Sequence, residues 1–259
     1  SPGLPPTLEV FRGLQVPVVS EIELAFDAAK CRFLAITGTD GKTTTTALTA
    51  HVLEFAKIRT AAAGNIGTPL CEVVQDFGAE DVIVAEVSAF QLWSTHHFHA
   101  EASAFTNIAE DHLDYFASFD EYVAAKRRLI AFATADDWAI LNEGDPYIRT
   151  WAEGFPGTVA SYGLKPADRE NHLWFDGEVI RRGDQALWRF DACQLKGAHN
   201  ALNMMAATHL ALRAGVSIEV IVEAMTTFKP LAHRVEPVAV VGGVAYLDDS
   251  KATNAHAAM

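Results

Sequence analysis

The sequence Gly38-Thr39-Asp40-Gly41-Lys42-Thr43 follows an apolar run at residues 33–37 and precedes a helical pattern of apolar residues. In this arrangement of strand, glycine-rich turn and helix, backbone N–H groups and the positive end of the helix dipole point towards one place. We call residues 38–43 the phosphate loop, because this point suits a phosphate, with Lys42 at its oxygens and Thr43 at Mg²⁺. The full pattern requires glycine where the chain has Ile36, so a turn that only caps a helix is the alternative.

Other apolar runs repeat this alternation of strand and helix. Residues 81–87, 102–108 and 138–141 have the continuous apolar character of strands buried on both faces of a parallel sheet. A helix is predicted from Ser118, its N-cap, to about residue 132. We therefore expect an α/β fold of the phosphate-loop type, in which a mostly parallel sheet is covered by helices on both faces.

The second half of the chain also predicts a small antiparallel patch. Asp176-Gly177 lies between two short runs, residues 172–175 and 178–181, which is a strong hairpin signal. Two helices are expected after it, at about residues 200–213 and 217–227, with Gly215 between them. A second hairpin is predicted at residues 235–241 and 244–248, joined by Gly242-Gly243.

Proline density marks a boundary near the start of the chain. Residues 1–20 include Pro2, Gly3, Pro5, Pro6 and Pro17, and this composition predicts a connecting segment. A central domain is then expected over residues 21–230, and residues 231–259 begin another unit.

The composition excludes several classes of protein. The 259 residues have a net charge of -13, half are hydrophobic and a fifth are charged, as in a globular rather than a disordered protein. No apolar run approaches the roughly 20 residues that span a bilayer, and no signal-type segment is present, so we expect a cytoplasmic protein with no membrane partner. The negative charge disfavours nucleic acid, for which Lys126-Arg127-Arg128 is a weak patch. Cys31, Cys71 and Cys193 are odd in number and far apart, which predicts reduced thiols.

Polar side chains follow two of the predicted strands. Glu86 ends a buried strand, where open α/β sheets place ligand groups, and a buried carboxylate requires a partner. That partner is either Mg²⁺ beside a bound phosphate or a residue that forms a salt bridge, and the sequence supports both alternatives equally. The next strand is followed by Asn107, Glu110, Asp111, His112 and Asp114. A histidine in such a group also fits an ordinary surface loop.

Two further groups give weaker signals. By itself, Lys126 fits the solvated face of an amphipathic helix. His96, His97 and His99 lack partners in a fixed geometry, which disfavours a metal site there.

Taken together, these residues resemble the Mur ligase family. Seven short blocks occur in the family's order over nearly the whole chain. Two motifs are similar to those of the members that add D-glutamate: Ser-x-Phe-Gln-Leu and Asp-Ser-Lys-Ala-Thr-Asn. The blocks are Gly38 to Thr43, Gly64-Asn-Ile-Gly67, Glu86-Val-Ser-Ala-Phe-Gln-Leu92, Asn107 to Asp114, Tyr122 to Lys126, Gly197-Ala-His-Asn200, and His233-Arg-Val-Glu236 with Asp249-Ser-Lys-Ala-Thr-Asn254.

The resemblance implies an ATP-dependent ligase of peptidoglycan precursor synthesis. Such an enzyme joins UDP-N-acetylmuramoyl-L-alanine to D-glutamate through an acyl phosphate, and we expect it to be a monomer. A related amide ligase, such as a folylpolyglutamate synthase or another Mur ligase, is one alternative. A non-catalytic phosphate-loop module that only binds nucleotide is another.

The resemblance also assigns roles to individual residues. The catalytic residues are Lys42, His112 and Lys126. Two Mg²⁺ ions are held by Thr43, Glu86, His112 and Lys126, the lysine being carbamylated. The ATP contacts are Gly38, Thr39, Asp40, Gly41, Lys42, Thr43, Thr44, Asn200, Arg234, Asp249 and Lys251. The substrate contacts are Asn65, Ser88, Gln91 and Thr253.

Three positions depart from the family pattern: Asp40 and Asp248 stand where asparagine is common, and Ala89 replaces a serine. A carboxylate at Asp40, beside the triphosphate, is expected to weaken nucleotide binding. The resemblance also identifies residues 1–20 with the tail of a missing N-terminal UDP-binding domain, and residues 231–259 with the start of a C-terminal domain. We therefore expect this polypeptide to bind nucleotide weakly and not to complete the ligation.

Overall fold

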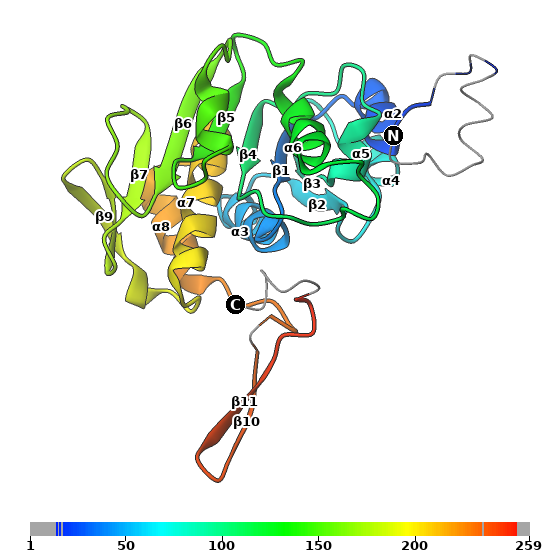
Figure 1. The fold of residues 1–259 in the computed structure, drawn as a ribbon. Coiled ribbons are helices and arrows are strands. Elements are labelled where there is room, and N and C mark those ends of the chain that lie inside the picture. Colours follow the sequence, from blue (N-terminus) through cyan, green and yellow to red (C-terminus); the bar gives the residue numbers. More distant parts are fainter. Residues whose placement is uncertain (1–13, 15, 17, 235, 253–259) are drawn as a thin grey trace.

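A nine-stranded sheet forms the centre of the computed structural model, which describes residues 14, 16, 18–234 and 236–252 (Figure 1). Its strands are β1 (Arg32–Thr37), β2 (Thr60–Gly64), β3 (Val82–Glu86), β4 (Ala102–Phe105), β5 (Trp138–Asn142), β6 (Thr158–Gly163), β7 (His172–Phe175), β8 (Val179–Arg182) and β9 (Gln185–Arg189). Their order across the sheet is β2-β3-β1-β4-β5-β6-β7-β8-β9. The pairs from β2 to β7 are parallel, whereas β7–β8 and β8–β9 are antiparallel.

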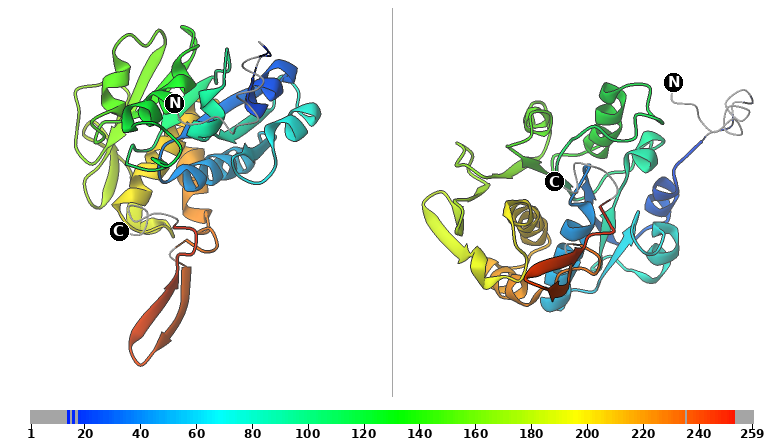
Figure 2. Two further views of the ribbon diagram at one scale, coloured as in Figure 1. Left: turned by 45° about the vertical axis from the view of Figure 1, so that its right-hand side comes forward. Right: turned by 60° about the horizontal axis from the view of Figure 1, so that its bottom comes forward.

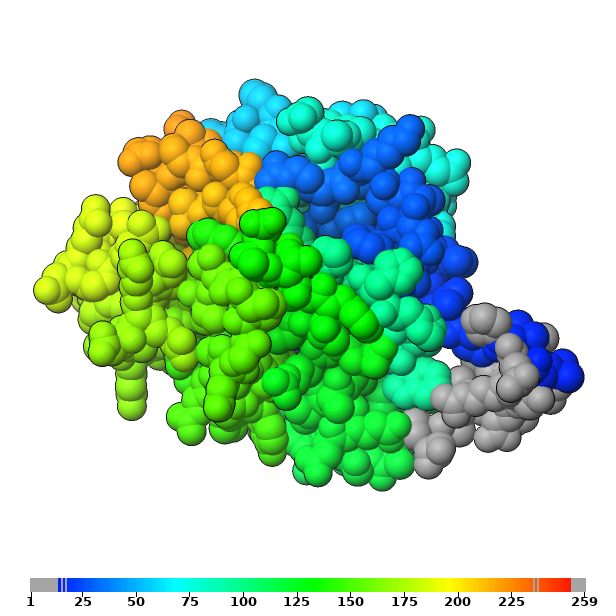
Figure 3. Space-filling model, turned by 90° about the horizontal axis from the view of Figure 1, so that it is seen from above, coloured from blue at the N-terminus to red at the C-terminus, as the bar shows by residue number. Residues whose placement is uncertain are grey.

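Helices cover both faces of the sheet, which confirms the predicted α/β class. One face packs against α3 (Lys42–Phe55), α7 (Ala198–Arg213) and α8 (Ile218–Thr227), and the other against α2 (Glu21–Ala28), α4 (Leu70–Val73), α5 (Ala89–Trp93) and α6 (Phe119–Arg127). Successive side chains of a strand point to opposite faces, so β1 contributes Leu34 and Ile36 to the first core and Phe33 and Ala35 to the second. Seen from above, α8 lies beside the early part of the chain that contains α3 (Figure 3).

Most of the predicted elements are confirmed, with shifted ends. The strand predicted at residues 102–108 ends at Phe105, and α6 continues only as the 3-10 turn η2 (Arg128–Ile130). Ser118 caps α6 as predicted, its hydroxyl accepting the Glu121 N–H at 3.2 Å. The hairpin at Asp176-Gly177 is also confirmed, but it continues the main sheet and gains a third strand, β9.

The second predicted hairpin is formed by β10 (Glu236–Val241) and β11 (Val244–Asp248). It projects from the body of the molecule, as Figures 1 and 2 show, and within the described residues no third strand joins it. Its large apolar side chains are exposed: Val238, Val240, Val241, Val244, Tyr246 and Leu247. The predicted connecting segment, residues 1–20, lies mostly outside the described residues. In the described part of the chain, no helix has the length and apolar character needed to cross a bilayer.

His209 is a fully buried titratable group in the middle of the fold. It belongs to α7, and its Nε2 lies 2.9 Å from the Ser161 carbonyl of β6. Burial lowers the pKa of His209 to about 4, and the charge of Arg182 acts in the same direction, against the hydrogen bond to Ser161. The folded protein therefore keeps this imidazole neutral at pH values where the unfolded chain binds a proton.

Because of His209, the free energy of unfolding is expected to decrease as the pH is lowered. Its contribution is complete above the ordinary pKa of about 6.5 and is lost as the pH falls towards 4, since only the unfolded chain then gains the proton. The loss is about 2 kcal/mol between about pH 7 and about pH 5. Urea unfolding at both pH values measures it, and His209→Gln is expected to flatten the difference, whereas the exposed His199→Gln leaves it intact. Equal pH dependence in both variants would contradict this account.

Candidate active site

The phosphate loop joins β1 to α3, and two of its glycines have positive φ angles. Gly38 has φ 149° and Gly41 has φ 80°. A Cβ at Gly41 would lie 2.5 Å from Asn203 Oδ1 on α7, and a Cβ at Gly38 would lie 1.8 Å from Thr106 Oγ1. Glycine is therefore required at both positions, because a side chain would be strained and would displace a neighbour.

Residues after β4 hold the loop in this conformation. Asn107 Oδ1 accepts the Asp40 N–H at 2.9 Å, and the Thr106 hydroxyl donates to the Asp40 carbonyl at 2.6 Å. The Asn107 carbonyl accepts the Thr39 N–H at 2.9 Å. The sequence marks Asn107 only as a polar residue after a strand, whereas the structure gives it the role of shaping the loop.

A cavity of about 240 Å³ opens beside the loop, where the carboxyl ends of β2, β3, β1 and β4 meet. Parallel strands bring these ends to one edge of the sheet, and ligands of open α/β folds bind at this edge. Five of the predicted site residues line the cavity: Lys42, Asn65, Ser88, His112 and Lys126. The other lining residues are Ala89, Phe90, Asp111 and Tyr122.

Lys126 is buried, with 2 % of its surface exposed, so its interpretation as a solvated helix residue is wrong. Its Nζ donates to the Gly38 carbonyl at 2.6 Å and lies 4.5 Å from the centre of the Tyr122 ring. Burial lowers the pKa of Lys126 well below its ordinary value, and the charge of Lys42 lowers it further, while nearby carboxylates oppose both. Both effects shift the titration of Lys126 towards the neutral, nucleophilic amine.

Lys42 is the second amine of the cavity. Its Nζ donates to the Thr39 carbonyl at 2.6 Å. Burial lowers the pKa of Lys42, the carboxylate of Glu86 opposes this most strongly, and the charge of Arg234 lowers the pKa as well. Arg234, at the base of the hairpin, is therefore close enough to influence this amine.

Glu86 ends β3 as a buried carboxylate with 3 % of its surface exposed. Its Oε1 accepts a hydrogen bond from Asn65 Nδ2 at 2.9 Å, but its buried Oε2 has no hydrogen-bond partner among the described residues. An unpartnered carboxylate oxygen is unfavourable in a protein interior, and a bound cation removes that penalty. The carboxylate, together with the Thr43 hydroxyl at the start of α3, is the oxygen donor set that suits Mg²⁺.

His112 lies on the cavity wall with φ 53°, which is unusual for a residue other than glycine. Its ring packs against Phe90 with the ring centres 4.8 Å apart, and its Nε2 lies 3.6 Å from an Asp111 carboxylate oxygen. Non-glycine residues with positive φ concentrate at functional sites, where the surroundings hold them. With 46 % of its side chain exposed, His112 is a loop residue that also lines the cavity.

Ser88 and Gln91 share a capping box at the start of α5. The Ser88 hydroxyl accepts the Gln91 N–H at 3.3 Å, and Gln91 Oε1 accepts the Ser88 N–H at 2.9 Å. This reciprocal pair fixes the end of the helix that faces the cavity. Gln91 itself is not among the residues that line the cavity.

Four predicted ATP contacts outside the phosphate loop are not among the residues that line the cavity: Asn200, Arg234, Asp249 and Lys251. Asn200, near the start of α7, donates from Nδ2 to the Lys196 carbonyl at 2.8 Å. The Lys251 N–H donates to the His233 carbonyl at 3.2 Å, which places Lys251 at the base of the hairpin with Arg234 and Asp249. Thr253 lies outside the described residues.

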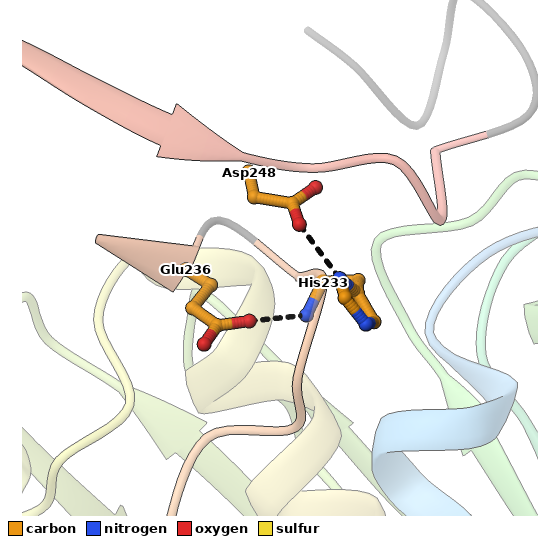
Figure 4. Close-up of side chains that lie close together, drawn as sticks. All are labelled: His233, Glu236 and Asp248. Atoms are coloured by element: carbon orange, nitrogen blue, oxygen red, sulfur yellow. Dashed lines mark hydrogen bonds and ion pairs between the residues drawn. The ribbon is translucent and has the colours of Figure 1, made fainter. Parts of the chain in front are cut away.

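His233, Glu236 and Asp248 form a cluster at the hairpin base (Figure 4). Their ligand atoms lie within 4.8 Å of one another, as metal ligands do. However, His233 Nδ1 lies 2.6 Å from Asp248 Oδ2, and the His233 N–H donates to Glu236 Oε2 at 2.7 Å. These bonds explain the cluster as a link between the two strands of the hairpin.

Tyr122 is the cavity residue that reasoning from the sequence missed. It is buried, and burial raises its pKa to about 12, so the phenol keeps its proton. A tyrosine four residues before a lysine on an amphipathic helix predicts only core packing. Its hydroxyl nevertheless lies 3.0 Å from Thr39 Oγ1 in the phosphate loop.

Comparison with known proteins places these features in a family. Residues 36–211 match the family model described as the Mur ligase middle domain. The UDP-N-acetylmuramoylalanine--D-glutamate ligase of Dechloromonas aromatica is 41 % identical over 100 % of this chain and 59 % of its own length. The protein of the same name from Acidobacterium capsulatum is 39 % identical over 100 % of this chain and 58 % of its own length. The chain thus spans less than two thirds of the length of these curated relatives.

Solved structures share the fold. The UDP-N-acetylmuramoylalanyl-D-glutamyl-2,6-diaminopimelate--D-alanyl-D-alanyl ligase of Acinetobacter baumannii has a TM-score of 0.67 at 18 % identity, covering 88 % of this chain and 53 % of that one. The UDP-N-acetylmuramate:L-alanyl-gamma-D-glutamyl-meso-diaminopimelate ligase of Neisseria meningitides has a TM-score of 0.65 at 19 % identity, covering 86 % of this chain and 75 % of that one.

Proposed function

Because the chain belongs to the Mur ligase family, we propose that it is the ATP-binding part of a ligase that adds D-glutamate to UDP-N-acetylmuramoyl-L-alanine. Relatives with that name, 36–41 % identical, support this choice over other ligases of the family. The observation that supports it most directly is the cavity beside the phosphate loop. The half-buried amine of Lys42 and the buried amine of Lys126 both line it, and the charge of Glu86, which has an unpartnered oxygen, acts on both amines.

The reaction proceeds in two steps. A carboxylate oxygen of the L-alanine group attacks the γ-phosphorus of ATP, the bond to ADP breaks, and an acyl phosphate forms. The amine of D-glutamate then attacks the acyl carbon, phosphate leaves, and the nitrogen loses a proton. Within this site, the Lys42 ammonium stabilises charge on the transferred phosphoryl group, and the glycines of the loop let backbone N–H groups approach the phosphates.

Of the proposed metal ligands, His112 and Lys126 line the same cavity. Thr43 and Glu86 would hold Mg²⁺ beside the β- and γ-phosphates, and His112 and carbamylated Lys126 would hold a second ion. When bound, Mg²⁺ supplies charge neutralisation at the phosphates. The carbamate forms when the neutral Lys126 amine attacks the carbon of CO₂ and the nitrogen loses a proton, which replaces a cation by an anionic oxygen ligand.

The remaining residues are assigned by the same proposal. Asn200 lies near the adenine and Asp249 near the ribose, while Arg234 and Lys251 contact phosphate. Asn65, Ser88 and Gln91 contact the muramoyl substrate, and Thr253 lies near D-glutamate. Residues 21–230 constitute the central ATP-binding domain in this scheme, and the hairpin belongs to the next one.

Titration calorimetry of the 259-residue chain with ATP tests the proposal. We expect binding that requires Mg²⁺, and an NMR carbamate signal after incubation with isotope-labelled CO₂. Lys126→Ala is expected to abolish that signal, and Lys165→Ala, a control that removes an exposed lysine, to retain it. Absence of Mg²⁺-dependent ATP binding by the unaltered chain would contradict the proposal.

A further inference from the structure

Tyr122 connects three parts of the cavity that are remote in the sequence. Its hydroxyl lies 3.0 Å from Thr39 Oγ1, which is 83 residues away. The Thr39 Oγ1 also accepts the Ala109 N–H at 3.0 Å and donates to the Ala109 carbonyl at 3.2 Å. The phosphate loop, the segment after β4 and α6 therefore meet at one buried hydroxyl group.

The hydrogen positions at this junction follow from counting donors. Thr39 Oγ1 has a single hydrogen, and the Ala109 carbonyl accepts it. Tyr122 must then be the donor in its bond to Thr39, and the Thr39 oxygen accepts from both Tyr122 and the Ala109 N–H. Tyr122→Phe removes one donor of this network without changing the shape of the side chain.

Thr39 and Tyr122 are also the contacts of the two amines. The Thr39 carbonyl accepts the hydrogen bond of Lys42 Nζ at 2.6 Å. The face of the Tyr122 ring lies 4.5 Å from Lys126 Nζ, which also donates to the Gly38 carbonyl next to Thr39. A shift of Tyr122 relative to Thr39 would therefore change the separation between Lys42 and Lys126.

We propose that Tyr122 is a positioning residue, whose hydrogen bond to Thr39 holds the phosphate loop against α6 in the geometry that binds MgATP. The inference rests on the proposed function, because it assigns Tyr122 to the same nucleotide site. In this role Tyr122 acts on the nucleotide through Thr39 and Lys42.

A double-mutant cycle with MgATP affinity as the readout tests this role. Tyr122→Phe is expected to weaken MgATP binding about fivefold, the effect of one neutral hydrogen bond. Thr39→Val is expected to weaken it more, because it also removes the two bonds to Ala109. The double variant is expected to bind about as weakly as Thr39→Val alone, because Thr39→Val already removes the bond to Tyr122.

Tyr162→Phe is the matched control for a purely structural effect. Tyr162 is a buried tyrosine of β6 whose hydroxyl donates to the Phe105 carbonyl at 2.8 Å. Its phenylalanine variant is expected to lose thermal stability to the same extent as Tyr122→Phe and yet to bind MgATP normally. All variants are compared by thermal melting first, so that affinities are measured on folded protein.

Three results would overturn the positioning role while leaving the proposed function intact. These are unchanged affinity in Tyr122→Phe, independent losses that multiply in the double variant, and an equal loss of affinity in Tyr162→Phe. Failure of the unaltered chain to bind MgATP would contradict the proposed function, and the role of Tyr122 with it.

Discussion

Lys42→Ala is expected to weaken MgATP binding by about 10- to 100-fold, since a hydrogen bond to a charged group contributes about 1.5–3 kcal/mol. The lysine begins α3, lines the cavity and is held by the Thr39 carbonyl, so its position is already set before nucleotide binds. The triphosphate replaces that carbonyl with a stronger, charged acceptor. Calorimetry with MgATP on the unaltered and variant chains measures the loss.

Lys30→Ala is the matched control for the change of charge. Lys30 is exposed and precedes β1, whereas the phosphate loop follows β1, so the two lysines lie at opposite ends of that strand. Lys30→Ala is expected to keep the affinity of the unaltered chain, because solvent and salt screen its charge over that distance. Equal affinity in Lys42→Ala and Lys30→Ala would show that Lys42 does not contact the phosphates.

Gly38→Ala is expected to destabilise the fold by about 3 kcal/mol or more and to lower the melting temperature by about 6–12 °C. The new Cβ would lie 1.8 Å from Thr106 Oγ1, and the φ of 149° is strained for alanine. Thr106 is branched at its Cβ and donates to the Asp40 carbonyl, so its displacement also breaks a bond that shapes the loop. Thermal and urea unfolding of the two chains measure the effect.

Gly215→Ala measures the loss of stability from a strained backbone without a steric clash. Gly215 has φ 96°, and a Cβ there would meet no atom within 4 Å. Its variant is expected to lose only about 1 kcal/mol, from the strained backbone. If Gly38→Ala lost no more than Gly215→Ala, the close approach of Thr106 would have no energetic consequence.

The parts of the fold that local chemistry determines are the parts that the sequence predicts. The strand, loop and helix around Gly38 follow from apolar periodicity and from two glycines with positive φ. The hairpin at Asp176-Gly177 follows from a two-residue turn signal, and the Ser118 cap from one hydroxyl. In the hairpin and the cap, the contacts that decide the structure lie within a few residues of one another, whereas the conformation of the loop also depends on Thr106 and Asn107.

Lys126 shows where that reasoning fails. Its periodicity on α6 is that of a solvated lysine, and only the resemblance to a family indicates a role for it. Its burial depends on a hydrogen bond to Gly38, 88 residues away, and on the packing of Tyr122 beneath it. Local patterns contain no information about such a contact, so periodicity alone predicts the wrong environment for the amine.

Helix α2 was missed for a similar reason. Its Glu23 is buried, and the carboxylate accepts the N–H groups of His96, His97 and Phe98 at 2.9, 2.8 and 3.2 Å. A glutamate that binds a distant loop has the same appearance in the sequence as one that faces solvent. The helix is therefore fixed by a polar tertiary contact, and apolar periodicity alone gives it little signal.

The hairpin β10–β11 affects the tendency of the molecule to associate with other copies of itself, which its core does not determine. Both edges of the described two-stranded ribbon present backbone groups without a ladder partner, and Val240 has 74 % of its surface in contact with solvent. Such an edge is a template for pairing with another copy, and the net charge of -13 opposes that encounter by mutual repulsion. At physiological ionic strength, salt screens the repulsion between charges that are more than about 8 Å apart. The apolar attraction remains, so we expect self-association to increase with ionic strength.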